Sequence, residues 1–304
     1  MFRDDFRVTG YIFGEGKKAL CVVGSVRGNE YQQIYTCSML IKRLTELEGA
    51  GLINSENQIL IIPSLNPYSM NIGKRFWPTD NTDINRMFPG YSLGETTQRI
   101  ADGVFKVISQ YDNGIQFASF YMPGTFSPHV RIMKTGFENV EKAKQFGMNN
   151  IVIRNTKPYD TTTLNYNWQI WDTDAFSLYT TSTTSLDTKS ADQTVECVLR
   201  FMAANDMINP QAADMISDSK ITPRVFFDKE LMTVRPNVSG IFLSKVSVDT
   251  AVTRGQLLAT VLDTSLGTVL EYLRSPIDGT VFFLHNDPFV YANTGAIKIL
   301  PEAF

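Results

Sequence analysis

The sequence predicts an α/β sheet flanked by helices, followed by a smaller C-terminal all-β domain. Two observations predict this fold class. In the first two-thirds of the 304 residues, short apolar runs alternate with segments of helical period, which is the pattern of a sheet with helices on its faces. From about Val234 the helical period disappears, and short β-type runs are separated by Gly and Pro, which is typical of an all-β unit.

Each predicted element of the first part rests on a local pattern. Residues 19–23 form an apolar run that ends at Gly24, as expected of a strand buried on both faces. Asn29 is predicted to cap a helix whose apolar residues recur at steps of three and four, and Gly49 is predicted to end it. Further strands are predicted at 59–63, 115–120, 151–154 and 175–180, and further helices at 95–109 and 191–204.

The C-terminal part contains a weak repeat. Gly240 and Gly279 each follow a small polar residue, lie about 40 residues apart and precede similar β-type runs, which predicts two similar halves packed together. The pattern resembles biotinyl and lipoyl carrier domains, so we expect a barrel-sandwich-like fold. We predict domains at 1–228 and 229–304, with residues 223–228 as the linker.

Composition excludes several classes of function. The chain has 28 Lys and Arg against 31 Asp and Glu, a net charge of −3, which gives no reason to expect nucleic acid as a partner. No apolar run approaches the roughly 20 residues of a membrane span, and the N-terminus has no apolar signal core. Three scattered cysteines without a CxxC pair indicate reduced thiols and predict a cytoplasmic protein. Only two histidines, His129 and His285, are present, which disfavours a metal held by several of them.

Three segments are candidates for a functional site. Residues 24–30 join a strand end to a helix, the position where ligands bind in open α/β sheets; a simple tight turn with a helix cap is the alternative. Residues 66–90 form a polar loop with Arg75 and Arg86, whose planar guanidinium groups suit carboxylates; solvated surface charge is the alternative. Residues 115–120 end a strand beside a Pro/Gly-rich loop, and an ordinary core strand is the simpler interpretation.

Together these segments resemble the succinylglutamate desuccinylase/aspartoacylase family, which has a zinc carboxypeptidase-like fold with a mixed sheet. The family carries an HGxE-type motif, at whose position this chain has Arg27-Gly28-Asn29-Glu30. The family then carries an N-P…R…D-x-N-R-x-F-P-G segment and later a D-L-H strand end, where this chain has Ala118-Ser119-Phe120. The second segment is the specific match, through Asn66, Pro67, Arg75, Asp83, Asn85, Arg86, Phe88, Pro89 and Gly90.

The departures from the family motif concern the metal. The resemblance implies zinc held by two His and one Glu, but only Glu30 matches, because Arg27 and Phe120 stand at the two His positions. Tyr179 stands at the position of the family's catalytic Glu. A catalytic zinc usually needs three protein ligands, so we predict no metal and no other cofactor, with Arg27 as a fixed cation paired with Glu30. A remodelled metal site that uses His129 is the alternative.

The resemblance implies hydrolysis of the amide or ester of a small N-acyl amino-acid-like substrate. Glu30 and Tyr179 would then be the candidate catalytic residues, and Arg27, Arg75, Asn85 and Arg86 would bind the substrate. The rival hypothesis is a catalytically inactive family member that binds a small acidic metabolite in an Arg-lined pocket. A third is an assembly role through the aromatic segment 159–171 and the β-domain, and a homo-oligomer is compatible with each hypothesis.

Overall fold

The computed structural model describes residues 6–182, 185–217, 219 and 221–302. Its first part is built on an eight-stranded sheet. The strands of this sheet are β1 (Tyr11–Phe13), β2 (Lys17–Ser25), β3 (Asn57–Ser64), β4 (Asn113–Ala118), β6 (His129–Lys134), β7 (Asn150–Asn155), β8 (Asp174–Tyr179) and β9 (Arg224–Phe227).

The sheet is mixed, as the family resemblance implied. Its strand order is β1-β3-β2-β4-β8-β6-β7-β9. The four central strands β3, β2, β4 and β8 are parallel. Strand β6 is antiparallel to β8, and β7 and β9 follow the direction of β6. The carboxyl ends of β2, β4 and β8 therefore meet at one edge, beside the amino end of β6.

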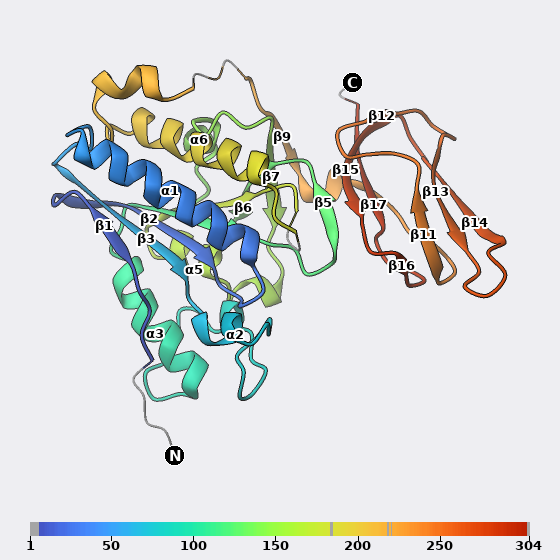
Figure 1. Cartoon of the computed structure of the whole chain (residues 1–304), viewed down its shortest axis with the longest axis horizontal. Coiled ribbons are helices and arrows are strands. Elements are labelled where there is room, and N and C mark those ends of the chain that lie inside the picture. The colour runs from blue at the N-terminus through green and yellow to red at the C-terminus, as the bar shows by residue number, and fades with distance from the viewer. Residues whose placement is uncertain (1–5, 183–184, 218, 220, 303–304) are drawn as a thin grey trace.

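Helices cover both faces of this sheet (Figure 1). They are α1 (Tyr31–Gly49), α2 (Pro67–Asn71), α3 (Thr96–Ile108), α4 (Val140–Lys144), α5 (Leu164–Ile170) and α6 (Thr188–Ala204), with 3₁₀ turns at Ile84–Arg86, Pro158–Asp160, Pro210–Met215 and Asp228–Glu230. Helices α1 and α6 pack on one face, and α3 and α5 pack on the other. No helix in the described part of the chain is both long enough and apolar enough to cross a membrane.

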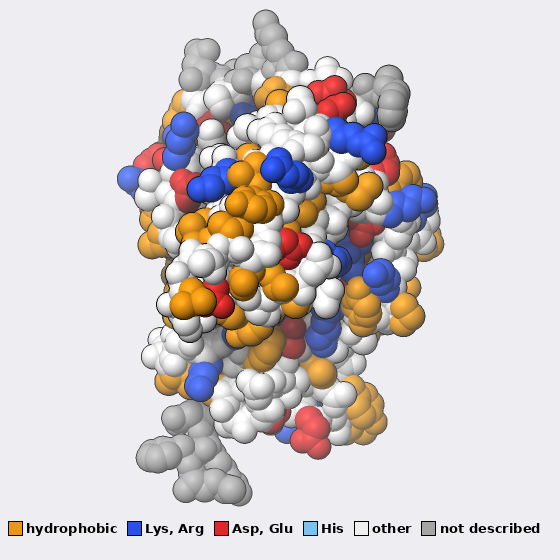
Figure 2. All heavy atoms as spheres, turned by 90° about the vertical axis from the view of Figure 1, so that its right-hand side faces the viewer, with side chains coloured by type: hydrophobic (Ala, Val, Ile, Leu, Met, Phe, Trp, Pro, Cys, Tyr) orange, Lys and Arg blue, Asp and Glu red, His pale blue; other side chains and the backbone are white. Residues whose placement is uncertain are grey.

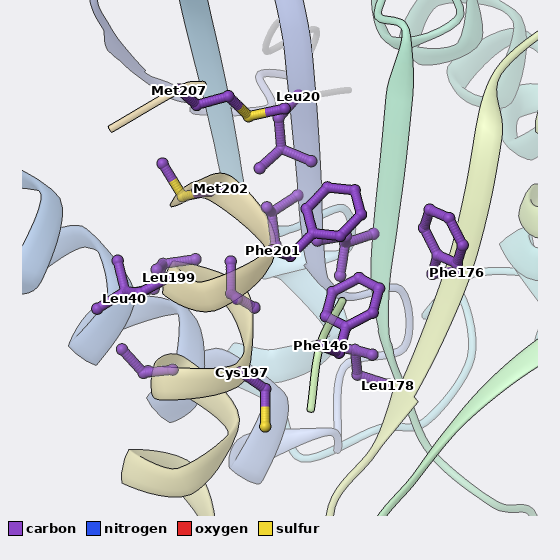
Figure 3. Packing of buried hydrophobic residues seen from close by; sticks show 14 of the residues in the cluster. Leu20, Leu40, Phe146, Phe176, Leu178, Cys197, Leu199, Phe201, Met202 and Met207 are labelled. Atoms are coloured by element: carbon purple, nitrogen blue, oxygen red, sulfur yellow. The ribbon is translucent and has the colours of Figure 1, made fainter. Parts of the chain in front are cut away.

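Apolar packing between the sheet and α6 forms the larger core (Figure 3). Phe146 and Phe201 stack with ring centroids 4.4 Å apart, and Phe176 of β8 meets both rings edge-on. All three side chains are fully buried. Truncating one such ring costs about 3–5 kcal/mol, so this cluster fixes the sheet that carries the site.

The C-terminal part consists of two antiparallel sheets. One has the order β10-β17-β15-β12, with β5 also paired to β15, and the other has the order β14-β13-β11-β16. Their strands are β5 (Gly124–Phe126), β10 (Met232–Val234), β11 (Gly240–Ser244), β12 (Ala251–Val252), β13 (Leu257–Leu262), β14 (Val269–Arg274), β15 (Gly279–His285), β16 (Phe289–Val290) and β17 (Ile297–Pro301).

The repeat in the sequence corresponds to crossed strand pairing. Gly240 opens β11 and Gly279 opens β15. Strand β16 of the second half pairs with β11 of the first, and β12 of the first half pairs with β15 of the second. Figure 2 looks at this end of the molecule, where exposed hydrophobic side chains lie among charged and polar ones.

Two local predictions were wrong. The cap of α1 is Glu30, not Asn29, and the helix begins at Tyr31. Residues 223–228 are not a free linker, because Arg224–Phe227 forms β9 and pairs with β7 at the edge of the large sheet. The other predicted strands and helices are present within a few residues of their expected bounds.

Candidate functional site

A cavity of about 360 Å³ lies at the edge where β2, β4 and β8 end. Eight of its lining side chains are Lys or Arg, whereas two, Asp160 and Asp228, are acidic. A larger hollow of about 550 Å³ between β3 and α3 is lined mainly by apolar side chains. Because titratable groups converge in the smaller cavity, it is the candidate site.

The turn after β2 is held against the polar loop by its glycine. The Gly28 N–H donates to the backbone oxygen of Arg75 at 3.0 Å. A Cβ at residue 28 would lie 2.4 Å from the Lys74 oxygen and 2.5 Å from the Met70 nitrogen. Only glycine permits this approach, which brings residues 27–30 beside Arg75.

The Glu30 carboxylate is buried and surrounded by donors. Its Oε2 accepts the backbone N–H groups of Val26 and Arg27 at 2.9 and 3.0 Å. Its Oε1 accepts Arg27 Nη1 at 3.1 Å and the hydroxyl of Ser119. Glu30 therefore closes the turn that precedes α1, and both oxygens are already occupied by donors from the chain.

Arg27 is paired with two carboxylates. Besides Glu30, it donates through Nε to both oxygens of Asp83 at 3.1 and 3.2 Å, and through Nη2 to Oδ2 at 2.8 Å. Burial by itself would lower the pKa of Arg27, but Glu30 and Asp83 outweigh that effect and raise it. The predicted pairing with Glu30 is confirmed. Arg27 also lines the cavity, but its guanidinium is already paired with Glu30 and Asp83.

The other predicted substrate-binding residues, Arg75, Asn85 and Arg86, line the same cavity. Arg75 donates to the Asn29 side chain at 3.2 Å. Burial, followed by repulsion from Arg27, lowers its pKa. Arg86 donates to the Tyr159 backbone oxygen at 2.8 Å. Within residues 6–182, 185–217, 219 and 221–302, neither Arg75 nor Arg86 forms an ion pair with a carboxylate.

Asn85 ties the polar loop to the next part of the site. Its Oδ1 accepts the Leu164 N–H at the start of α5, at 3.2 Å. Tyr159 and Asn165 of the aromatic segment also line the cavity. Trp168 is fully buried, however, and Trp171 is 55% exposed. The segment 159–171 is thus divided between the cavity, the core and the surface.

Tyr179 lies on the cavity wall, in contact with the Arg131 and His129 side chains. Its hydroxyl accepts from Arg131 Nη2, and the Arg131 guanidinium carbon is 4.3 Å from the centre of its ring. The His129 ring stacks on it with centroids 4.6 Å apart. His129 is buried, its Nδ1 is 2.8 Å from the Ser127 oxygen, and burial lowers its pKa to about 3.

Sequence reasoning missed the basic residues that come from other strands. Arg131 and Arg154 lie on β6 and β7, and Lys298 lies on β17 of the C-terminal part. Arg154 pairs with Asp160 at 3.1 Å and with Asp228 at 3.3 Å. The alternating pattern of β6 and β17 offered a signal, since each places one basic residue among buried apolar neighbours.

The model of the succinylglutamate desuccinylase/aspartoacylase catalytic domain matches residues 16–205, which include every predicted site residue. The chain belongs to the succinylglutamate desuccinylase/aspartoacylase family. The names within this family (desuccinylase, deacetylase, aspartoacylase) describe deacylases of small N-acyl amino acids.

Solved structures of desuccinylase/aspartoacylase relatives share the whole fold. A succinylglutamate desuccinylase from Silicibacter sp. TM1040 aligns with a TM-score of 0.79 at 16% identity, over 96% of this chain and 88% of that one. The product-bound ectoine utilization protein EutE (DoeB) from Ruegeria pomeroyi aligns with a TM-score of 0.76 at 16% identity, over 96% and 87%.

One curated relative is closer in sequence over a shorter stretch. The N-alpha-acetyl-L-2,4-diaminobutyric acid deacetylase of Halomonas elongata is 34% identical over 95 residues. This alignment spans 31% of the present chain and 26% of the deacetylase.

The residues at the positions of the family's zinc ligands do not fit the ion. A ligand oxygen must offer a lone pair, but both Glu30 oxygens already accept hydrogen bonds from Val26, Arg27 and Ser119. A guanidinium beside the carboxylate repels a cation. In the part of the chain that the structure describes, no three His, Cys, Asp or Glu side chains converge as a metal site.

Two residues considered for the metal point elsewhere. The sequence placed Phe120 at a ligand position, but its ring packs edge-on against Phe126 and Phe283 at 5.1 and 5.4 Å. The residue of this strand end that reaches Glu30 is Ser119. His129 lies in the same aromatic cluster as Phe126, so the structure does not bring it to Glu30. The catalytic roles assigned to Glu30 and Tyr179 stay predictions.

Proposed function

We propose that this family member binds a small anion of the N-acyl amino-acid type in the basic cavity and does not hydrolyse it by the zinc mechanism. One observation carries the proposal. At the carboxyl edge of the sheet, the Arg27 and Ser119 side chains donate hydrogen bonds to Glu30. Arg75 and Arg86 line the adjoining cavity, and neither has a carboxylate partner among the described residues.

Electrostatics favours an anionic ligand. Arg27 balances only one of the two negative charges of Glu30 and Asp83, so these carboxylates still partly offset Arg75. The cavity lining as a whole is nevertheless basic, with eight Lys or Arg against two Asp. Charged groups taken from water without a partner are unfavourable. A bound carboxylate would relieve that penalty through the planar forks of Arg75 and Arg86, with the Asn85 amide available for a carbonyl group.

Calorimetric titration of the whole chain with a panel of N-acetyl amino acids tests the binding. The acidic members should bind, and Arg86→Gln should weaken them about tenfold or more, because a hydrogen bond to a charged group is lost. Arg254→Gln serves as the matched control, since this exposed arginine lies outside the cavity. Failure of every N-acetyl amino acid to bind the unaltered chain would overturn the proposal.

Hydrolysis remains the second candidate, favoured by the family membership and by the Asp83–Gly90 block. We expect no release of free amine from the same N-acetyl amino acids, with or without added zinc. Turnover that rises with zinc to about one ion per chain and disappears in Glu30→Gln would establish the hydrolytic function instead.

A further inference from the structure

Arg131 is a basic side chain that forms no ion pair with an acidic residue in the described part of the chain. It projects from β6 into the cavity, where Nη2 donates to the Tyr179 hydroxyl. Its Nε is fully buried and has no hydrogen-bond partner among the described residues. Burial, followed by repulsion from Arg154, lowers the pKa of Arg131 to about 9. A buried polar group without a partner is uncommon in a folded protein.

Lys298 enters the same cavity from the C-terminal sheet. Its Nζ lies 5.2 Å from the centre of the Phe120 ring. The Lys298 Nζ forms no hydrogen bond or ion pair with any other described residue. Burial, followed by repulsion from Arg131, lowers the pKa of Lys298 to about 8. Arg131 thus destabilises the charged form of Lys298, and both side chains line the same cavity.

The nearby carboxylates of Asp160 and Asp228 form their ion pairs with Arg154 and not with Arg131 or Lys298. Arg154 takes both oxygens of Asp160, with Nε to Oδ2 at 3.1 Å and Nη2 to Oδ1 at 3.3 Å. Arg154 also takes Asp228 at 3.3 Å, and the second Asp228 oxygen accepts the Asn155 N–H. Arg131 and Lys298 therefore add positive charge to the cavity that no carboxylate among the described residues pairs with.

We propose that Arg131 and Lys298 form a second anion-binding point, which holds an oxyanion between the eight-stranded sheet and the C-terminal sheet. This inference deepens the proposed function, because it assigns the ligand a second anionic group apart from the one bound by Arg75 and Arg86. The Arg131 fork suits a group with two acceptor oxygens, a carboxylate or a phosphate, and Lys298 adds a point charge.

Tyr179 is a positioning residue in this arrangement. Its ring lies under the Arg131 guanidinium, and its hydroxyl accepts Nη2. These contacts hold the fork in one orientation and leave Nε free. The two parts are joined through β5 and β15, with Phe126 opposite Phe283, and Lys298 of the C-terminal part lines the same cavity.

Calorimetric titration with inorganic sulfate and with succinate tests the proposal and separates a tetrahedral anion from a carboxylate. At least one of the two should bind the unaltered chain, and Arg131→Gln and Lys298→Gln should each weaken it about tenfold or more. Arg254→Gln and Lys245→Gln are the matched controls, because both side chains are outside the cavity. Tyr179→Phe should weaken the same anion by a smaller factor.

The outcomes separate this inference from the proposed function. Sulfate or succinate binding that survives Arg86→Gln but not Arg131→Gln supports a distinct second point, even if N-acetyl amino acids fail to bind. Equal losses in Arg86→Gln and Arg131→Gln would show a single point and overturn the inference, while leaving the proposed function intact. Absence of binding by both probes to the unaltered chain would also overturn it.

Thermal unfolding distinguishes a binding role from a structural one. If Arg131 is present for a ligand, Arg131→Met removes an uncompensated charge, and the ligand-free variant should melt at or above the temperature of the unaltered chain. A structural role for Arg131 predicts a clear decrease in the melting temperature. Such a decrease, with anion affinity unchanged in Arg131→Gln, would overturn the proposal.

Discussion

Arg27 and Asp83 lie 56 residues apart in the sequence, yet Arg27 donates to both carboxylate oxygens of Asp83. This pair joins the turn after β2 to the 3₁₀ turn that carries Asn85 and Arg86. The same guanidinium holds Glu30 at 3.1 Å. The Arg27 guanidinium thus pairs with two carboxylates, Glu30 and Asp83, that would otherwise repel each other.

Removal of this cation should destabilise the fold. Arg27→Ala would leave the Glu30 and Asp83 carboxylates largely buried and without their partner. We expect a loss of about 3 kcal/mol in the free energy of unfolding, at the lower end for a broken buried pair because Asp83 is partly exposed. Urea denaturation of both chains measures the difference.

A surface pair provides the comparison. Lys17→Ala breaks the exposed contact with Asp112, formed at 3.3 Å, and should cost less than about 1 kcal/mol. Adding Asp83→Asn to Arg27→Ala should recover part of the loss, because one unpaired charge is removed. Equal small losses in Arg27→Ala and Lys17→Ala would contradict a stabilising role for the buried pair.

Replacing the two donors around Glu30 by histidine should create a zinc site. Arg27 and Ser119 are the side chains that contact Glu30 Oε1, so Arg27→His with Ser119→His places two imidazoles beside a carboxylate. Two His and one Glu are a known ligand set for catalytic zinc. Elemental analysis of the purified variant should find about one zinc per chain.

The matched variant uses the position that the sequence suggested. Arg27→His with Phe120→His should not acquire zinc, because residue 120 faces Phe126 and Phe283 rather than Glu30. Stoichiometric zinc in this second variant, or in the unaltered chain, would show that our assignment of the metal position is wrong.

The sequence predicted the order of elements well because their signals are local. Apolar runs located β2 and β3, and a helical period located α3 and α6. Strands β1, β5, β6 and β9 were missed. Strands β1, β5 and β9 have only three or four residues and gain their order from distant partners, whereas β6 has six residues. Strand β5 pairs with β15, more than 150 residues away, and no local pattern records such a pairing.

The sequence predicted only part of the site, because only some of the site residues belong to local motifs. Arg27, Arg75, Asn85 and Arg86 belong to recognisable motifs, and all four line the cavity. Arg131 and Lys298 belong to none, and only the packing of the two parts brings them together. Ser119 and Phe120 directly follow β4 and contact different partners: Ser119 donates to Glu30, whereas the Phe120 ring packs in the aromatic cluster. A shift of one residue in an alignment therefore exchanges their roles.

Anion affinity at the second point should depend on pH through Lys298. Because the pKa of Lys298 is lowered to about 8 by burial and by Arg131, its charge is lost as the pH rises through that value. Arg154, Arg235 and Asp228 also act on it. Sulfate affinity, measured by calorimetry at constant ionic strength, should fall about fourfold between pH 7 and pH 8.5.

Lys298→Gln provides the control for this pH dependence. The variant should bind sulfate weakly but with little change over the same pH range, because Arg131, with a pKa of about 9, titrates mainly above it. A fourfold fall that persists in Lys298→Gln would assign the titration to another group.

His129 should make the fold sensitive to mild acid. Burial lowers its pKa to about 3, whereas an unfolded histidine titrates near 6.5. Between these values the unfolded chain binds one more proton than the folded chain, so stability is complete above pH 6.5 and decreases as the pH falls toward 3. At pH 5 the loss from this residue is about 2 kcal/mol.

Urea denaturation from pH 7 to pH 4 measures this loss as the slope of the free energy of unfolding against pH. The variant His129→Phe, which keeps an aromatic ring against Tyr179 and Phe126, should reduce that slope. Because the carboxylates that titrate in this range are the same in both chains, equal slopes would show that His129 is protonated in the folded state.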